Sequence, residues 1–212
     1  LACYRDDKWA TVTVPQEYRT GVSFSFVEVD DAGMIWFSGN EHFLRYNPAT
    51  DVWQPYYYES NNSDYRYSSI QKLIVDAGKN IWVLNGGGCY HLDSGTWTLS
   101  EPFSRAPAVD IKLDKQGRIN AAGFTNNAAA EMILHAAMKS DLLPGGSWSA
   151  TQCVVKGDVC NLTCFDPVRN IWFFSTYTYR GGNHMYAMEN GQCSEITYPG
   201  EDTTKRVTAL DM

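Results

Sequence analysis

Aromatic, amide and arginine side chains stand outside the repeating part of this sequence, and together they could bind a polar ligand. Aromatic rings stack on the apolar face of a sugar, while amide and guanidinium groups hydrogen-bond its hydroxyls. The same residue types also form a wet, tyrosine-rich surface for a protein partner, and the residues alone leave both uses open. The candidate binding residues are Asn40, His42, Tyr65, Arg66, Asn85, Asn126, Tyr177, Tyr179 and Arg180.

Histidines are the other side chains with chemistry of their own, and one stands near the third strand of each predicted repeat. A metal ring is disfavoured, because no carboxylate or second histidine recurs in register with them. The sequence contains neither a glycine-rich phosphate motif nor a nucleophile elbow. We therefore predict a protein that is not an enzyme and has no metal or cofactor. The alternative is a lyase or hydrolase that uses a histidine or an acid–base pair in a central cleft. The histidines are His42, His91, His135 and His184.

Six cysteines are present, and none has the spacing of a zinc site. Buried free thiols are the first expectation. If a bridge forms, Cys153 with Cys160 is the predicted pair, because one connecting loop separates them. Cys3, Cys89 and Cys193 fall in equivalent outer strands of different repeats, too far apart to bond one another. Cys3 is read as a strand residue, with lipidation of this cysteine as the alternative.

A short turn-and-strand stretch recurs four times and must position these residues. In each copy an Asp stands five residues before an Ile, and in three copies a Trp follows the Ile. Asp and Gly suit a tight turn, and an Ile-Trp-Phe run suits a strand buried on both faces. Trp36, Trp82 and Trp172 are thus predicted core residues on equivalent strands. The aspartates read as turn formers are Asp30, Asp76, Asp114 and Asp166.

Longer spacings give the fold class. Five landmarks recur at intervals of 44 to 51 residues: Trp9, Trp53, Trp97, Trp148 and Cys193. That period, with about four strands per repeat, is typical of a β-propeller. We predict an all-β protein in which residues 1–212 form a single propeller of about five repeats with four-stranded antiparallel blades. The alternative is that these residues are a fragment of a larger, seven-bladed propeller.

The third repeat departs from the pattern. It lacks the Trp after Ile119, and residues 126–139 are rich in alanine. Helix propensity favours a helix there, whereas the repeat requires a strand. Because tertiary context often overrides propensity, we predict a strand near residues 132–136.

Blade topology brings the candidate binding residues to one face. In a four-stranded blade, the loop between strands two and three lies on the same side as the connection to the next blade. We call this side the loop face. The opposite side, which bears the four aspartate turns together with Lys79 and Arg169, is the turn face. Function is predicted on the loop face, because loops on a rigid scaffold usually carry it.

Charge and hydropathy exclude two classes of partner. The net charge is -7 and there is no basic cluster, so nucleic acid is not an expected partner. No apolar run is long enough to span a membrane. The expected partners are a small molecule or oligosaccharide, a protein, or further propeller blades.

The repeat motif resembles a known family. Asp-x-x-Gly-x-Ile-Trp-Phe, followed by residues 43–47 (FLRYN), is similar to the two-component regulator propeller repeat of bacterial hybrid histidine kinase sensors. The resemblance covers nearly the whole chain, but Lys79 and Arg169 stand where the family has Gly. It implies a periplasmic or extracellular sensor domain in signal transduction, often with a carbohydrate-derived ligand.

Two weaker resemblances imply other functions. The Tyr-to-Trp spacing and Gly86-Gly87-Gly88 are similar to kelch repeats, which mostly bind proteins. The Ile-Trp-Phe runs also resemble streptogramin lyases, which are seven-bladed enzymes. Since one fold hosts all three functions, the fold alone does not choose among them.

Overall fold

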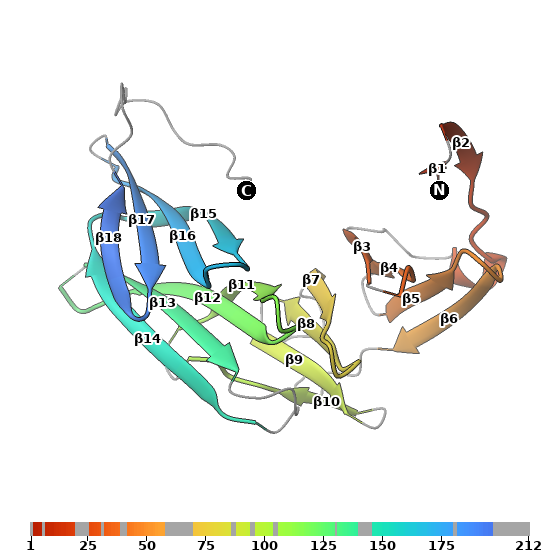
Figure 1. Ribbon diagram of the computed structural model, residues 1–212, viewed down its shortest axis with the longest axis horizontal. Coiled ribbons are helices and arrows are strands. Elements are labelled where there is room, and N and C mark those ends of the chain that lie inside the picture. The colour runs from red at the N-terminus through yellow and green to blue at the C-terminus, as the bar shows by residue number, and fades with distance from the viewer. Residues whose placement is uncertain are drawn as a thin grey trace. The chain divides into compact units, whose positions relative to one another are not determined.

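The structure is a computed structural model that describes most of the chain (Figure 1). Strands account for nearly all of its secondary structure, with a single 3-10 turn at Gln16–Tyr18 and no α-helix in the described ranges. None of the described residues belongs to a helix long and apolar enough to cross a membrane. The described ranges are 2–5, 7–19, 26–30, 32–38, 42–57, 70–85, 88–93, 96–103, 106–129, 131–139, 146–179 and 182–196.

The chain divides into two compact units, Leu1–Ile70 and Gln71–Met212, which are described separately. The prediction of one propeller domain over residues 1–212 stays a prediction. The first unit contains an antiparallel hairpin of β1 (Ala2–Arg5) and β2 (Lys8–Thr11). It also contains a four-stranded antiparallel sheet of β3 (Phe26–Val29), β4 (Ile35–Ser38), β5 (His42–Asn47) and β6 (Val52–Tyr57).

The hairpin confirms the reading of Cys3 as a strand residue, since Cys3 pairs with Ala10 and Tyr4 with Trp9. Trp9 itself is 75% exposed, so this landmark marks a strand without filling a core. In the four-stranded sheet, by contrast, Trp36 is only 2% exposed and Tyr46 stacks on Trp53 with ring centroids 4.6 Å apart.

Three blade-like sheets form the second unit, each a four-stranded antiparallel meander in chain order (Figure 1). The first contains β7 (Ile70–Val75), β8 (Ile81–Asn85), β9 (Gly88–Asp93) and β10 (Thr96–Leu99). The second contains β11 (Ala108–Leu113), β12 (Ile119–Asn126), β13 (Met132–Lys139) and β14 (Trp148–Val155). The third contains β15 (Val159–Asp166), β16 (Ile171–Tyr177), β17 (Asn183–Glu189) and β18 (Gln192–Ile196).

The alanine-rich segment is a strand, as the repeat predicted, and its packing explains its composition. Because side chains alternate across a strand, Ala137 of β13 enters the core that contains Trp82, and Ala136 packs against the core that contains Trp172. Both tryptophans are almost fully buried, at 0% and 2% exposure. Small residues in the middle sheet therefore leave room for a large ring from each neighbour.

A polar contact joins the first strands of these three sheets. The Asp110 carboxylate on β11 accepts hydrogen bonds from Lys72 Nζ of β7 at 3.0 Å and from Thr163 Oγ1 of β15 at 2.9 Å. Burial lowers the pKa of Lys72, and the nearby Asp110 charge opposes that shift. These two hydrogen bonds join the three strands. The side chains of the Lys72–Asp110 ion pair are mostly buried.

The aspartates are turn formers, as predicted. In the first three turns the aspartate Oδ1 accepts a backbone N–H from the residue four positions on, as Met34 N to Asp30 Oδ1 at 3.0 Å shows. The third residue after the aspartate has positive φ, including Lys79 at 66°, so that turn forms without the family's glycine. The fourth turn differs: Asp166 pairs with Ile171, and the positive φ falls on Asn170 at 57°.

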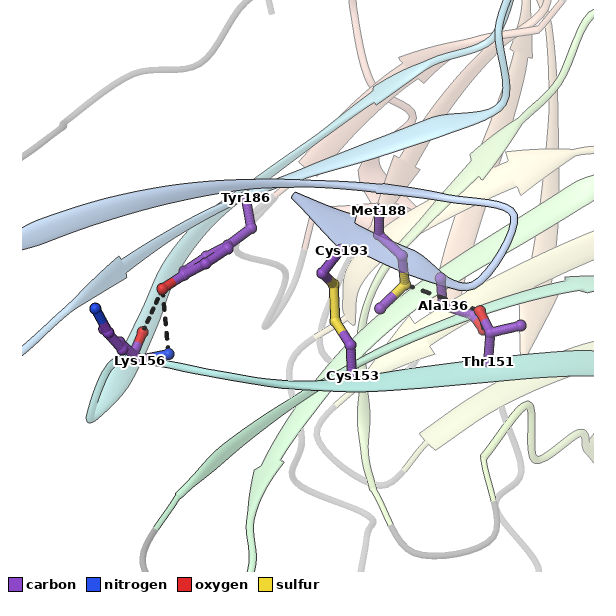
Figure 2. The surroundings of a disulfide bond; sticks show 7 residues. All are labelled: Ala136, Thr151, Cys153, Lys156, Tyr186, Met188 and Cys193. Carbon is purple, nitrogen blue, oxygen red and sulfur yellow. Dashed lines mark hydrogen bonds between the residues drawn. A yellow bond between two sulfur atoms is a disulfide. The ribbon is translucent and has the colours of Figure 1, made fainter. Parts of the chain in front are cut away.

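The predicted Cys153–Cys160 bridge is wrong, because Cys153 is bonded to Cys193 with Cα atoms 6.2 Å apart. Cys153 lies on β14, the last strand of its sheet, and faces the last strand of the next sheet (Figure 2). The chain between Cys153 and Cys160 crosses to β15, the first strand of the next sheet, where Cys160 is buried in a core. Proximity in sequence therefore did not give proximity in space.

Three other cysteines, Cys89, Cys160 and Cys164, form no disulfide, which agrees with the first expectation of buried thiols. Cys89 and Cys160 are buried, and Cys164 is half-buried. Burial raises the pKa of the Cys89 thiol to about 12, against a smaller opposing effect of the Lys139 charge. A thiol with so high a pKa is unreactive at neutral pH, which fits a packing role.

Candidate functional site

The structure places five of the nine predicted binding residues. Asn40, Tyr65, Arg66 and Arg180 lie outside the described residues. The backbone of His42 begins β5, where it pairs with Tyr57, and its side chain is likewise outside the description. The residues whose side chains are placed are Asn85, Asn126, Tyr177 and Tyr179.

Two of these residues come together at the end of β16. Tyr177 and Tyr179 form an edge-to-face pair with ring centroids 6.0 Å apart and an interplanar angle of 86°. Tyr179 is 74% exposed, whereas Tyr177 is partly buried. An exposed aromatic ring braced by a second ring is a platform on which a flat apolar surface can stack.

Asp158 holds this pair in place, and the sequence analysis did not identify it. Asp158 Oδ2 accepts the backbone N–H of Tyr179 at 2.7 Å, and the Asp158 N–H is donated to the Tyr177 carbonyl at 2.8 Å. Asp158 lies in the connection from β14 to β15. The contact therefore confirms, for this sheet, that a connection between sheets lies beside a loop between the second and third strands. The Gly157-Asp158 dipeptide between two apolar strands was the available signal.

The connection from β14 to β15, which carries Asp158, is held by hydrogen bonds from side chains of β16 and β17. Tyr186 Oη accepts the Lys156 N–H at 3.1 Å (Figure 2). Thr176 Oγ1 donates to the Lys156 carbonyl at 2.9 Å. Burial raises the pKa of Tyr186, so this phenol stays protonated. Gly157 has φ 144°, and a Cβ there would lie 2.8 Å from Thr176, so only glycine fits.

Asn126 and Asn85 lie on other sheets than the tyrosine pair. Asn126 ends β12 opposite Met132 and is exposed, next to an Asn127 side chain that accepts the N–H of Glu131 at 2.9 Å. Asn85 ends β8 and is only 2% exposed, so its amide is inside the sheet and not on an accessible surface.

Histidines do lie on the third strands, as predicted, and none of them is part of a metal-like cluster in the described ranges. His91 and His135 are buried. Burial lowers the pKa of His135, which packs on Phe103 with ring centroids 5.4 Å apart. His184 Nδ1 lies 2.6 Å from Glu195 Oε1.

Comparisons with known proteins show a likeness in fold. No protein-family model and no curated protein sequence matches the chain. Among solved structures, the chain is similar to the extracellular domain of BT4673 from B. thetaiotaomicron, described as a hybrid two-component system. The TM-score is 0.53 at 12% identity over 93% of this chain and 32% of that one. The corresponding domain of BT3049 gives a TM-score of 0.47 at 10% identity, over 93% of this chain and 30% of that one.

This chain therefore spans about a third of the length of the extracellular domains it matches. At such low identity the first likeness supports the arrangement of antiparallel sheets and carries no residue-level information about function.

Proposed function

We propose that this chain is a non-catalytic, ligand-binding sensor module of a β-propeller in an exported bacterial protein. Its sheets are either part of a ring of about five blades or a section of a longer, seven-bladed propeller. The repeat motif, the succession of four-stranded sheets and the likeness to an extracellular two-component domain all support this proposal. The activity and partners of the whole protein are part of the proposal.

The observation that carries a binding role is the braced tyrosine pair. Blade packing does not need Tyr179, whose ring is mostly exposed, yet its backbone is held by a hydrogen bond to Asp158. An exposed ring on a fixed loop can stack on a sugar without a large loss of conformational entropy, which favours modest but specific affinity. We infer that the ligand is a carbohydrate or a similar polar molecule and that it binds on the loop face.

The disulfide supports an exported location. Disulfides persist in the periplasm and outside the cell and are rare in the cytosol. The Cys153–Cys193 bond joins two sheets that form part of one continuous packing unit, as expected for a structural bridge.

The test is a glycan array followed by calorimetry with the variant Tyr177→Ala/Arg180→Ala. This change should lower the free energy of unfolding by about 1 kcal/mol, because Tyr177 is partly buried and packs against Tyr179. Binding of any glycan identified on the array should weaken. The matched control is Lys79→Ala/Arg169→Ala on the turn face, which should bind as wild type does.

Four other outcomes would contradict the proposal in different ways. If the loop-face variant binds normally and the turn-face variant does not, the function lies on the turn face. Turnover of the glycan would favour the lyase or hydrolase alternative. Failure to bind any glycan, together with a copurifying protein, would favour a kelch-like scaffold. A loss of binding in both variants would mean that the changes disturb the fold.

A further inference from the structure

The carboxylate that braces the tyrosine pair uses only one of its two oxygens. Asp158 Oδ2 accepts the backbone N–H of Tyr179 at 2.7 Å, and no described residue donates to Asp158 Oδ1. The Asp158 side chain is only half-buried, so this second oxygen is not enclosed in the way that the indole nitrogen of Trp172 is. One carboxylate oxygen is therefore open to a ligand at the loop face.

The charge of Asp158 has no counter-ion in the described part of the chain. A carboxylate that accepts a bond from a neutral backbone N–H remains negative. Lys156, two residues earlier, forms no ion pair with it, whereas Asp110 and Asp114 lie 3.0 and 2.7 Å from a lysine and an arginine nitrogen. Asp158 is thus an accessible negative charge beside the exposed residue Tyr179.

The exposed ring attracts the same sign of charge as the carboxylate does. Tyr179 is 74% exposed and meets Tyr177 edge to face, with ring centroids 6.0 Å apart. The face of a tyrosine ring has a negative electrostatic potential, so it attracts a cation placed over it. Because Asp158 is bonded to the backbone of the residue that carries this ring, a single small ligand reaches both groups.

These two features select a ligand by its charge and its shape. A neutral hydroxyl would satisfy Asp158 Oδ1 without offsetting its charge, and an anion would be repelled by the carboxylate and by the ring face. A protonated primary amine donates hydrogen bonds to the carboxylate and carries the charge that both groups attract. An amino sugar combines such an amine with a flat apolar face that stacks on Tyr179.

The backbone on both sides of the site is held in place before any ligand binds. The Thr178 N–H is donated to the Gly182 carbonyl at 3.1 Å, which closes the loop that carries Tyr179. The Asp158 N–H is donated to the Tyr177 carbonyl at 2.8 Å, which joins this loop to the connection between the sheets. A ligand therefore binds without a large loss of conformational entropy in the protein.

We propose that Asp158 and the tyrosine pair recognise an amino sugar. The protonated amine donates to Asp158 Oδ1, and the apolar face of the sugar ring lies on Tyr179. This inference rests on the proposed function, because it names the ligand class of the same site. The aromatic ring binds any sugar of suitable shape, and Asp158 determines the specificity by selecting the amine.

The experiment compares trimers that share one β-1,4-linked backbone, in mildly acidic buffer of low ionic strength. Chitotriose has free amines, triacetylchitotriose has neutral amides, and cellotriose has hydroxyls at the same positions. Calorimetry measures the affinity, and NMR of protein labelled with ¹⁵N-tyrosine follows the Tyr179 amide signal, which is identified by its loss in Tyr179→Phe. Chitotriose should shift this signal saturably.

The expected preference is modest because the site is partly exposed. Chitotriose should bind about five- to tenfold more tightly than either neutral trimer, which is the size of an exposed ion pair combined with a cation–π contact. Added salt should reduce this preference by screening the charge. Tyr179→Ala should weaken the binding of all the trimers, because each of them stacks on the ring.

Matched variants assign the preference to one carboxylate. Asp158→Asn keeps a carbonyl oxygen for the Tyr179 N–H and removes the charge, so chitotriose should then bind within about twofold of cellotriose. Glu131→Gln is the control, because it removes the same charge from the equivalent loop of sheet β11–β14 and keeps an acceptor for Asn127. This control should retain the preference for chitotriose.

The outcomes distinguish a failure of this inference from a failure of the proposed function. If a neutral trimer shifts the Tyr179 signal and chitotriose has no advantage, the sugar site stands and the choice of an amine is wrong. A preference that survives Asp158→Asn, or that falls equally in Glu131→Gln, would refute the role of Asp158. If no trimer shifts the Tyr179 signal the inference fails, and if no glycan on the array binds either, the proposed function fails with it.

Arg180 provides a last check, because it follows Tyr179 in the sequence and lies outside the described residues. If Arg180→Ala creates a preference for chitotriose that the wild type lacks, this arginine already neutralises Asp158. That result would overturn the inference for the native chain. Equal preferences in Arg180→Ala and wild type would support it.

Discussion

Sheets β7–β10 and β15–β18 share a strand order, a turn aspartate and a buried tryptophan, but they differ in how the tryptophan is satisfied. In the first, Trp82 is fully buried and its N–H reaches Asp76, which is itself buried. In the second, Trp172 is as deeply placed, and its N–H has no acceptor. The turns differ in register: Asp166 pairs with Ile171, and its Oδ2 lies 3.9 Å from Arg169 Nε, whereas Asp76 N–H is donated to the Asn80 carbonyl.

The comparison separates two roles of the repeat. Alternating apolar residues place the tryptophan in the core of either sheet, because burial depends on strand periodicity. The polar partner of the indole depends on the shape of the turn, which varies independently of that periodicity. A departure in the turn can therefore leave a buried donor unsatisfied while the sheet stays intact.

The largest expected effect is the loss of either ring. Trp82→Ala should lower the free energy of unfolding by about 3–5 kcal/mol, because the change leaves a large cavity in the core. Trp172→Ala should fall at the lower end of that range, since no hydrogen bond is lost with the ring. Denaturant unfolding of both variants measures the difference. A cost below about 1 kcal/mol for Trp82→Ala would contradict its place in the core.

The next largest effect concerns the Cys153–Cys193 disulfide, which joins β14 to β18. The cysteine of sheet β7–β10, Cys89, is a free thiol. The variant Cys153→Ser/Cys193→Ser should lose roughly 3–4 kcal/mol, because the bond closes a loop across 40 residues in sequence. Unfolding midpoints with and without reductant provide the measurement. Cys164→Ser is the control and should respond to reductant as wild type does. A linked pair of peptides containing Cys153 and Cys160 would refute the assignment.

A finer test of the comparison replaces the indole with a smaller aromatic ring that has no N–H group. Trp82→Phe should cost about 1–2 kcal/mol more than Trp172→Phe, because only the first removes a hydrogen bond to a buried carboxylate. Both changes remove similar volume from equivalent strands, so the volume effect cancels in the difference. Equal costs in thermal or denaturant unfolding would show that Trp172 Nε1 is satisfied in solution.

The smallest effect is a pH dependence in the middle sheet, which packs against both of the sheets compared. Burial lowers the pKa of His135 from the ordinary value of 6.5, so the unfolded chain binds a proton more readily than the folded one. Stability should therefore fall as the pH is lowered from 6.5 toward the folded-state pKa and should be insensitive to this group above 6.5. His135→Phe should reduce this slope. An unchanged slope in urea unfolding at several pH values would assign the dependence to other groups.

Much of the fold could be predicted from the repeat. The strand order within each sheet, the core positions of Trp36, Trp82 and Trp172, and the turn role of the aspartates are confirmed. The strand at Met132–Lys139 is also confirmed, against its helix propensity, because its alanines fit between two tryptophan-containing cores. Trp9 shows the limit of the method, because a landmark residue on a two-stranded hairpin is exposed.

The candidate site could be predicted only in part. Tyr177 and Tyr179 were identified because no repeat explains them, and the structure joins them. Asp158 was missed because its partner is a backbone N–H twenty-one residues away, which no local pattern reveals. Asn85 was expected on a loop but is buried, because β8 continues through it.

The amino-acid sequence by itself determined the strands, their antiparallel order and the positions of the large rings, because these depend on local periodicity and turn chemistry. Tertiary structure decided the Cys153–Cys193 pairing and the bracing of Tyr179. Both depend on distances between residues on different sheets or on connections between them. Such distances follow from how sheets pack face to face, which a pattern read along one chain does not contain.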